Sequence, residues 1–184
     1  MRIRIAFLLA SLLALPALAG EITNASILTA MNYYRAQGGL PPLVENAQLD
    51  NAANDRMKDM EELGYWAHQA PDGRSPFLWL RLRRYDYRAA GENLAAGFET
   101  AELLVQSWME SEGHRANIMS ATFADCGVAI IDGSTTGPAT GRSVVVMFGK
   151  TASDEPAIAP APKHAAAVVV TPPAEPGRNR VPRL

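Results

Sequence analysis

The stretch WMESEGHRAN, residues 108–117, is the part of the sequence from which a fold and a candidate site can be worked outward. Before it, apolar residues recur at helical spacing, and the run Ser-Glu-Gly at 111–113 predicts that this helix ends near Gly113. We therefore expect His114 to lie just past a helix end, among carboxylates and beside Trp108. A histidine in such surroundings can bind a ligand, hold a metal ion or move a proton.

Two further residues join His114 in the candidate site. The chain has three histidines, and His68 ends the segment GYWAH at 64–68. Glu92 lies between the two histidines, in the segment GEN at 91–93. Our hypothesis is that the fold brings His68, Glu92 and His114 to one cleft.

Two histidines and a glutamate are a sufficient ligand set for a zinc ion, with water as the fourth ligand. His68, Glu92 and His114 are therefore candidate ligands of a divalent metal such as zinc. Their spacing adds no support, because the histidines are far apart in the sequence and neither belongs to an HExxH motif. The alternative, that each histidine is a hydrogen-bonded structural residue, stays open.

Three residues are candidates for a catalytic role: Glu92, Glu110 and Ser111. Glu110 precedes His114 by four residues, so an unbroken helix would place both on one face, but the glycine between them argues against such a helix. Ser111 could pair with His114 as a nucleophile, although no GxSxG elbow surrounds it. The residues expected to line the cleft are His68, Glu92, Ser111 and His114.

The first 19 residues have the pattern of a signal peptide. Arg2 and Arg4 form a basic start, residues 5–15 are apolar, and an Ala-Leu-Ala cleavage site ends at Ala19. The apolar run is too short to cross a bilayer as a helix. We expect an exported protein, secreted or periplasmic, that is cleaved after about Ala19 and has no membrane span.

The other end, residues 152–184, holds seven of the 13 prolines. Such a segment cannot bury enough apolar surface to offset the cost of ordering, so we expect a disordered tail rich in proline and alanine. The folded domain would then comprise residues 20–151.

The chain carries a net charge of −2 at pH 7, and loss of the two signal-peptide arginines makes it more negative. A net acidic domain lacks the electrostatic footprint of a nucleic-acid-binding protein, so no nucleic-acid partner is expected. A local basic cluster is interpreted as a solvated helix face and loop; it consists of Arg81, Arg83, Arg84 and Arg88. Cys126 is the single cysteine, and its place in an apolar run predicts core packing.

Helical patterns cover most of the first half of the chain. A first helix is expected over residues 24–37, with Asn24 or Ser26 as its cap. The best-marked helix begins after Asn46 and ends at Gly64. Its expected buried stripe comprises Leu49, Ala52, Ala53, Arg56, Met57, Met60 and Leu63. A short helix is expected from Phe77 to about Arg84, after a cap at Ser75.

The pattern changes to strands in the second half. Residues 127–131 and 143–148 are nearly continuous in apolar residues, which predicts two strands of a sheet that is covered on both faces. The ten residues between them, 132–141, read as a loop, which indicates an antiparallel hairpin. The glycine-flanked segment 91–97 fits neither pattern clearly.

These segments, taken together, resemble the CAP superfamily (cysteine-rich secretory proteins, antigen 5, pathogenesis-related 1), in particular its bacterial SCP-like branch. The resemblance rests on GYWAH at 64–68, GENL at 91–94, WMESEGHRANI at 108–118, and the glycines of the two strands. It runs from about Ile27 to Gly149, with the motifs in family order.

The resemblance implies an α+β fold, a three-layer α-β-α sandwich with a central antiparallel sheet. It also implies that His68, Glu92 and His114 face one cleft, which binds a divalent metal in some members. Many eukaryotic members complete a tetrad with a second glutamate three residues after the tryptophan, where this chain has Ser111. A four-ligand site therefore cannot be carried over.

An incomplete catalytic set favours binding over catalysis, and family resemblance alone does not decide function. We expect an extracytoplasmic binding module whose partner is a lipid, a cell-envelope component or a protein. The alternative is a metal-dependent hydrolase or peptidase that uses His68, Glu92 and His114, with Glu110 as a general base.

Overall fold

The computed structural model describes residues 21–133 and 141–152. The expected signal peptide and nearly all of the expected tail lie outside these residues. The helices are α1 (Asn24–Gln37), α2 (Ala47–Leu63), α3 (Leu78–Leu82), α4 (Ala101–Glu110) and α5 (Glu112–Ile118). The strands are β1 (Val44–Glu45), β2 (Tyr87–Ala96), β3 (Asp125–Asp132) and β4 (Arg142–Thr151). None of the helices described is long and apolar enough to cross a membrane.

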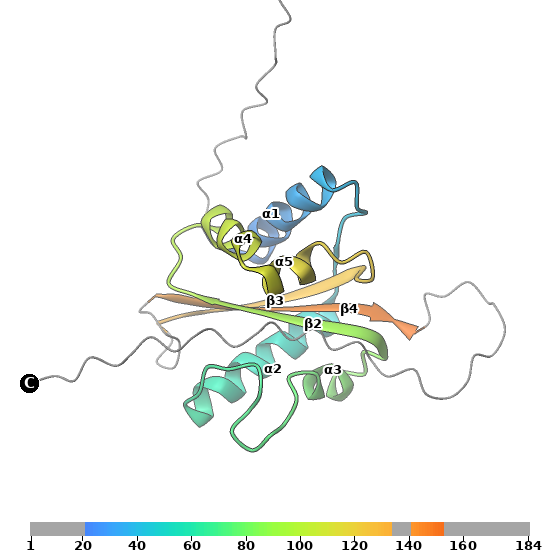
Figure 1. Cartoon of the computed structure of the whole chain (residues 1–184). Coiled ribbons are helices and arrows are strands. Elements are labelled where there is room, and N and C mark those ends of the chain that lie inside the picture. Colours follow the sequence, from blue (N-terminus) through green and yellow to red (C-terminus); the bar gives the residue numbers. More distant parts are fainter. Residues whose placement is uncertain (1–20, 134–140, 153–184) are drawn as a thin grey trace, which may run out of the picture.

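The strands form one sheet in the order β1-β3-β4-β2. The expected hairpin is present as β3 and β4, and β2 adds to β4, also antiparallel. The two-residue strand β1 pairs parallel to β3, so the sheet is mixed and not purely antiparallel. Helices α1, α4 and α5 cover one face and α2 and α3 cover the other, which gives the expected three layers (Figure 1).

Strand β2 is the longest of the elements that the sequence pattern did not reveal. Its segment YRAAGENLAA is dominated by alanine and glycine, which favour strands poorly. Its extended form comes from pairing with β4, which runs from Tyr87 opposite Thr151 to Ala96 opposite Ser143. Because β2 is an edge strand, loops and helices from both layers can meet beside it.

Helix α2 agrees with its sequence pattern. Asn46 Oδ1 accepts hydrogen bonds from the backbone N–H groups of Gln48 and Leu49, and Gly64 ends the helix in a left-handed conformation (φ 69°). The stripe expected to be buried is buried from Leu49 to Met60. Leu63, the last residue of the helix, is an exception and is 54% exposed.

The helix ends elsewhere differ from the expected ones by a few residues. Thr23, and not the expected Asn24 or Ser26, is the N-cap of α1, and it forms a capping box with Ser26. Helix α3 is shorter than expected, although Ser75 Oγ does accept a hydrogen bond from the N–H of Phe77.

The expected position of His114 just past a helix end is wrong. Helix α4 already ends at Glu110, and Ser111 takes an extended conformation (ψ 122°) that breaks the helix. The N–H of Arg115 then donates to the Ser111 carbonyl and begins α5, so His114 lies inside this second helix. Sequence spacing did not show the break, because Gly113 is tolerated within a helix as well as after one.

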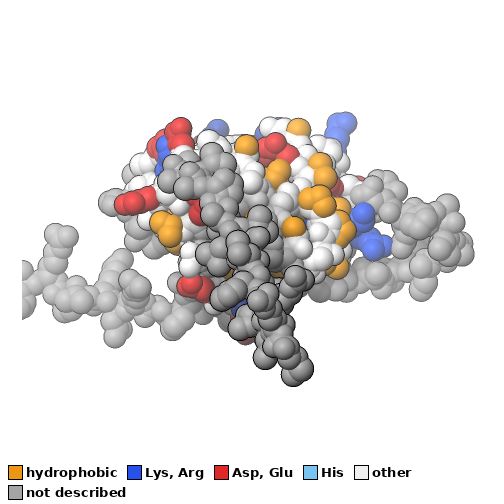
Figure 2. All heavy atoms as spheres, turned by 90° about the horizontal axis from the view of Figure 1, so that it is seen from above, with side chains coloured by type: hydrophobic (Ala, Val, Ile, Leu, Met, Phe, Trp, Pro, Cys, Tyr) orange, Lys and Arg blue, Asp and Glu red, His pale blue; other side chains and the backbone are white. Residues whose placement is uncertain are grey.

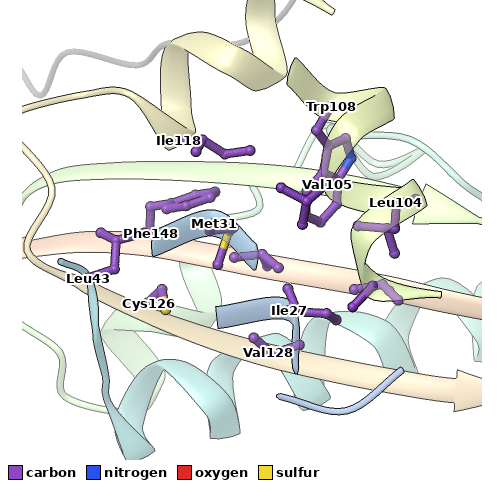
Figure 3. Packing of buried hydrophobic residues seen from close by; sticks show 14 of the residues in the cluster. Ile27, Met31, Leu43, Leu104, Val105, Trp108, Ile118, Cys126, Val128 and Phe148 are labelled. Carbon is purple, nitrogen blue, oxygen red and sulfur yellow. The ribbon is translucent and has the colours of Figure 1, made fainter. Parts of the chain in front are cut away.

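A hydrophobic core lies on each face of the sheet. Figure 3 shows one of them, in which α1, α4 and α5 pack Met31, Val105, Trp108 and other apolar side chains against the strands. Cys126 belongs to this core, as expected. Burial, with smaller effects from nearby carboxylates, raises the pKa of its thiol to about 12, so the thiol stays protonated at neutral pH.

Buried Arg35 fastens the end of α1 to the segment that follows α5. Its guanidinium donates to the backbone carbonyls of Pro41, Ile118, Ser120 and Phe123, at 2.8 to 3.2 Å. Burial lowers its pKa from the usual value, the direction expected for a desolvated cation. Three of these bonds, to Ile118, Ser120 and Phe123, fix the chain path between α5 and β3.

The outer surface of the α1, α4 and α5 layer mixes apolar and charged groups. Seen from above, apolar side chains gather mostly on one half of this face and acidic side chains mostly on the other (Figure 2). The exposed apolar residues of this layer include Tyr33 on α1 and Leu103 on α4, which are 42% and 51% exposed.

Candidate functional site

Glu92 lies in the middle of edge strand β2 and is 2% exposed. Alternate residues of a strand face opposite sides of the sheet. Ala90 and Leu94 pack in the core that α2 covers, whereas Ala89 and Ala95 pack in the opposite core. The Glu92 side chain therefore points toward the α2 layer.

Arg56 is the charge partner of Glu92. Arg56 lies on the buried stripe of α2, is 1% exposed, and donates from Nε to Glu92 Oε2 at 3.0 Å. Two buried charges are costly to remove from water, and their attraction offsets that cost only when further hydrogen bonds satisfy both groups. The neighbouring loop supplies those bonds.

His68 provides the second bond to the carboxylate. Its Nδ1 lies 2.7 Å from Glu92 Oε1, and its side chain is 25% exposed. A carboxylate can only accept, so Nδ1 carries the proton and donates it. In the neutral imidazole, Nε2 is then an acceptor on a ring whose orientation is fixed by a buried group.

Arg56 also holds the loop on which His68 lies. Its Nη1 donates to the Tyr65 hydroxyl, and its Nη2 donates to the carbonyls of Ala67 and His68. The Tyr65 hydroxyl donates in turn to Asp59. Burial and this bond to Asp59 raise the pKa of Tyr65 to about 12. The loop is therefore anchored to α2 through one guanidinium.

The network reaches the surface at Arg74. Arg74 Nη2 lies 3.1 Å from Asp59 Oδ1, and its Nε lies 2.5 Å from Asp72 Oδ2. The Arg74 guanidinium also lies 5.7 Å from the Trp79 ring centroid. We call the connected set the Arg56 network; it consists of Arg56, Asp59, Tyr65, His68, Arg74 and Glu92.

His114 is tied to the residue of β2 that follows Glu92. The Asn93 side chain donates to the His114 carbonyl at 3.2 Å, and the two rings of Trp108 and His114 lie 6.2 Å apart. Asn117 donates to the Glu92 carbonyl and to Asn93 Oδ1. Since Asn93 and Glu92 face opposite sides of β2, α5 and the His68 loop approach this strand from different layers.

The remaining candidates lie where α4 meets α5. Ser111 joins the two helices and is half-buried. Glu110 is exposed, and its Oε1 lies 3.5 Å from Gln106 Nε2. Glu112 is exposed in the first turn of α5. The structure thus joins His68 to Glu92 directly, while a cleft shared with Ser111 and His114 stays a prediction.

The surroundings of Glu92 decide whether these donors fit a divalent metal. Both carboxylate oxygens of Glu92 are already bonded, one to Arg56 and one to His68. Among residues 21–133 and 141–152, no group of three or more His, Cys, Asp or Glu side chains is placed to hold a metal ion. In this arrangement the residues do not fit a three-ligand zinc centre, and the predicted ligand set stays a prediction.

Sequence reasoning missed the group on which this site depends. The sequence pattern places Arg56 on the buried stripe of α2 but does not show which residue pairs with it. A charged residue on an otherwise apolar stripe is a signal that a buried acid must lie nearby. The sequence gives no comparable sign that Asn93 and Asn117 tie α5 to β2, because asparagine is mostly found on protein surfaces.

A known protein family matches most of the domain. The CAP family, described as the cysteine-rich secretory protein family, matches residues 28–147. The chain is 38% identical over 112 residues to an uncharacterized protein of Bacillus subtilis, YkwD, across 61% of this chain and 40% of that protein. It is 29% identical over 104 residues to an uncharacterized membrane protein of the same organism, YlbC, across 56% of this chain and 30% of that protein. The chain thus spans less than half the length of these two relatives.

Solved structures show the same fold. An extracellular protein of Bacillus anthracis with an SCP domain is 27% identical, with a TM-score of 0.57, over 69% of this chain and 40% of that one. An outer surface protein of Borrelia burgdorferi is 20% identical, with a TM-score of 0.58, over 68% and 90% of the two chains. A cysteine-rich secretory protein of Staphylococcus aureus is 18% identical, with a TM-score of 0.53, over 70% and 40%.

Proposed function

Because this chain belongs to the CAP family of cysteine-rich secretory proteins, we propose that it acts outside the cytoplasm as a binding module. Its partner would be a lipid, a cell-envelope component or a protein. Its contact surface would be centred on His68 and would extend toward Ser111 and His114. The protein would be exported by its first 19 residues, and the extracellular and surface proteins that share the fold support this location.

The observation that carries the proposal is the burial of Glu92 between two partners. A general base or a metal ligand must be within reach of the substrate or the metal ion. Glu92 is 2% exposed and bonds Arg56 through one oxygen and His68 through the other. Its chemical effect is to orient His68, whose imidazole is 25% exposed.

A preoriented imidazole suits recognition. A ligand that donates to Nε2, or that stacks on the ring, meets a group whose rotation is already restricted, so binding loses less conformational entropy. Half-buried Tyr65 and Trp66 precede His68 and add aromatic surface beside it. Mixed aromatic and polar groups of this kind are typical of binding surfaces.

A metal-assisted hydrolase is the second candidate. One observation favours it: zinc-binding histidines usually donate their second ring N–H to a carboxylate, as His68 does to Glu92. In that arrangement Glu92 would orient a ligand without being one. The hypothesis would then lose one of its three ligands, and no hydrolytic step follows from the residues in place.

The test is co-sedimentation of the purified protein with two probes, peptidoglycan sacculi and vesicles of phosphatidylglycerol and phosphatidylethanolamine. We expect saturable binding to one probe, and at least about tenfold weaker binding by His68→Asn, which corresponds to about 1.4 kcal/mol. Asparagine can still donate to Glu92 but lacks the Nε2 edge.

Lys58→Ala is the matched control, because Lys58 is 74% exposed on α2 and pairs only with exposed Glu62 among the described residues. It should bind like the wild type. Equal binding by wild type and His68→Asn would refute the role of His68. Failure of the wild type to bind either probe would refute an envelope or lipid partner.

A further inference from the structure

A pocket of about 450 Å³ is lined by residues from the end of α3 to the start of β2, so it lies away from Glu92 in the middle of that strand. It is lined by Arg81, Arg84, Tyr85, Asp86 and Tyr87. Its size is within the range of small-molecule sites, about 300–1,000 Å³. It contains two of the four arginines that the sequence pattern assigned to a solvated helix face.

The arginines of this region fall into two kinds. Arg83 is neutralised, because its Nε and Nη2 each lie 2.6 Å from a carboxylate oxygen of Asp55. Arg81 is held by an aromatic residue, since its Nε and Nη2 lie 3.3 and 3.1 Å from the Tyr87 hydroxyl. Within the described ranges, no carboxylate forms an ion pair with Arg81 or Arg84. The positive charges of Arg81 and Arg84 are therefore not neutralised by a described carboxylate and can attract an anionic ligand.

Arg84 has an unusual backbone for its residue type. Its φ of 59° lies in the left-handed region, and it is the one non-glycine residue with positive φ among those described. An L-residue with a large side chain costs roughly 1–2 kcal/mol there, whereas glycine costs nothing. The turn is held through its backbone carbonyls, since the Gln48 side chain donates to those of Arg83 and Arg84. The contacts that hold this turn do not use the Arg84 guanidinium, which leaves that group available to a ligand.

We propose that this pocket binds the phosphate group of a small hydroxylated ligand, such as a polyol phosphate or sugar phosphate. Guanidinium groups match phosphate geometry and form charge-assisted hydrogen bonds with it. The Asp86 carboxylate repels an anion placed next to it but accepts hydrogen bonds from hydroxyl groups. Arg81 and Arg84 therefore select the phosphate, and Asp86 selects the hydroxyls beside it.

The tyrosines form the wall of this pocket. The Tyr85 hydroxyl donates to Asp125 at 2.6 Å and its side chain is 1% exposed, so the residue is fixed. Tyr87 keeps the Arg81 guanidinium 5.9 Å from its ring centroid. A charged group that is already in place loses little freedom when it binds an anion. This site is independent of the contact surface at His68.

The test is calorimetric titration with glycerol 3-phosphate at about 0.15 M salt, where long-range charge effects are screened. The wild type should bind saturably, and Arg84→Gly should bind at least tenfold more weakly. The denaturation midpoint of Arg84→Gly should be equal to or higher than that of the wild type, because glycine relieves the left-handed backbone. Weaker binding without lower stability separates a site residue from a structural one.

Arg83→Gln is the matched control, since it removes the same charge one residue away from a guanidinium that Asp55 already neutralises. It should bind within about threefold of the wild type, and so should His68→Asn. Equal binding by Arg84→Gly and wild type would overturn the proposal, as would equal losses in Arg83→Gln and Arg84→Gly. Equal affinity for glycerol and glycerol 3-phosphate would also overturn it, because the phosphate group would then contribute nothing to binding. Binding to phosphatidylglycerol vesicles without binding to glycerol 3-phosphate would show a membrane surface and also contradict it.

Discussion

Gly127→Ala should lower the free energy of unfolding by about 3 kcal/mol or more. A Cβ atom at position 127 would lie 2.1 Å from the carbonyl carbon of Leu49 and 2.2 Å from the N of Asp50. These are backbone atoms in the first turn of α2, so they cannot rotate away. The helix would have to move off β3, and the bond from the Val128 N–H to Asp50 Oδ1 would lengthen from 2.8 Å. Denaturant titration measures the loss.

Gly38→Ala is the control for this substitution. A Cβ at position 38 meets Met119 Cε at 2.5 Å, the flexible end of a side chain that can change rotamer. Gly38→Ala should therefore cost much less than Gly127→Ala. Similar denaturation midpoints for Gly38→Ala and Gly127→Ala would mean that α2 does not approach β3 as closely as described.

Arg56→Met should lower the free energy of unfolding by about 3–5 kcal/mol, the usual cost of leaving one partner of a buried ion pair alone. Glu92 would keep only His68, and the carbonyls of Ala67 and His68 would lose their donor. The loop that carries His68 should loosen at the same time. Chemical denaturation, together with hydrogen exchange of residues 65–68, checks both effects.

The double variant Arg56→Met/Glu92→Leu separates charge from packing. Replacing both members of a buried pair by apolar residues is often neutral or stabilising. The double variant should therefore be more stable than Arg56→Met alone. A cost below about 1 kcal/mol for Arg56→Met, or a double variant that is less stable than the single one, would contradict the role given to this ion pair.

The sequence predicted the architecture because the periodic elements were strongly marked. Asn46 and Gly64 bounded α2, and Met57 lies on its buried face as expected. The apolar runs around Val128 and Val145 became the central strands. The resemblance to the CAP family supplied the layers, which the shared fold confirms.

The elements that escaped prediction depend on contacts distant in the sequence. Strand β2 is extended because β4 pairs with it, not because its alanines and glycines favour a strand. The break between α4 and α5 depends on the backbone of Ser111. The sequence pattern showed neither, so His114 was expected past a helix end and lies within one.

The candidate site was predicted in part. His68 and Glu92 were expected to meet and do so, at 2.7 Å. Arg56, which binds the other oxygen of Glu92, could not be paired from the sequence, because 36 residues separate the two. This guanidinium forms an ion pair with the carboxylate that the metal hypothesis needs as a ligand.

The account rests most on the claim that Glu92 orients His68 and does not serve a metal or a substrate. Nitrogen-15 NMR of the histidine rings at neutral pH tests this claim directly, in the protein alone and with one equivalent of zinc. We predict that His68 Nδ1 is protonated and Nε2 is not, and that equimolar zinc leaves both ring nitrogens of His68 unchanged. An unprotonated Nδ1 in the protein alone, or a joint shift of the His68 and His114 nitrogens on adding zinc, would contradict it.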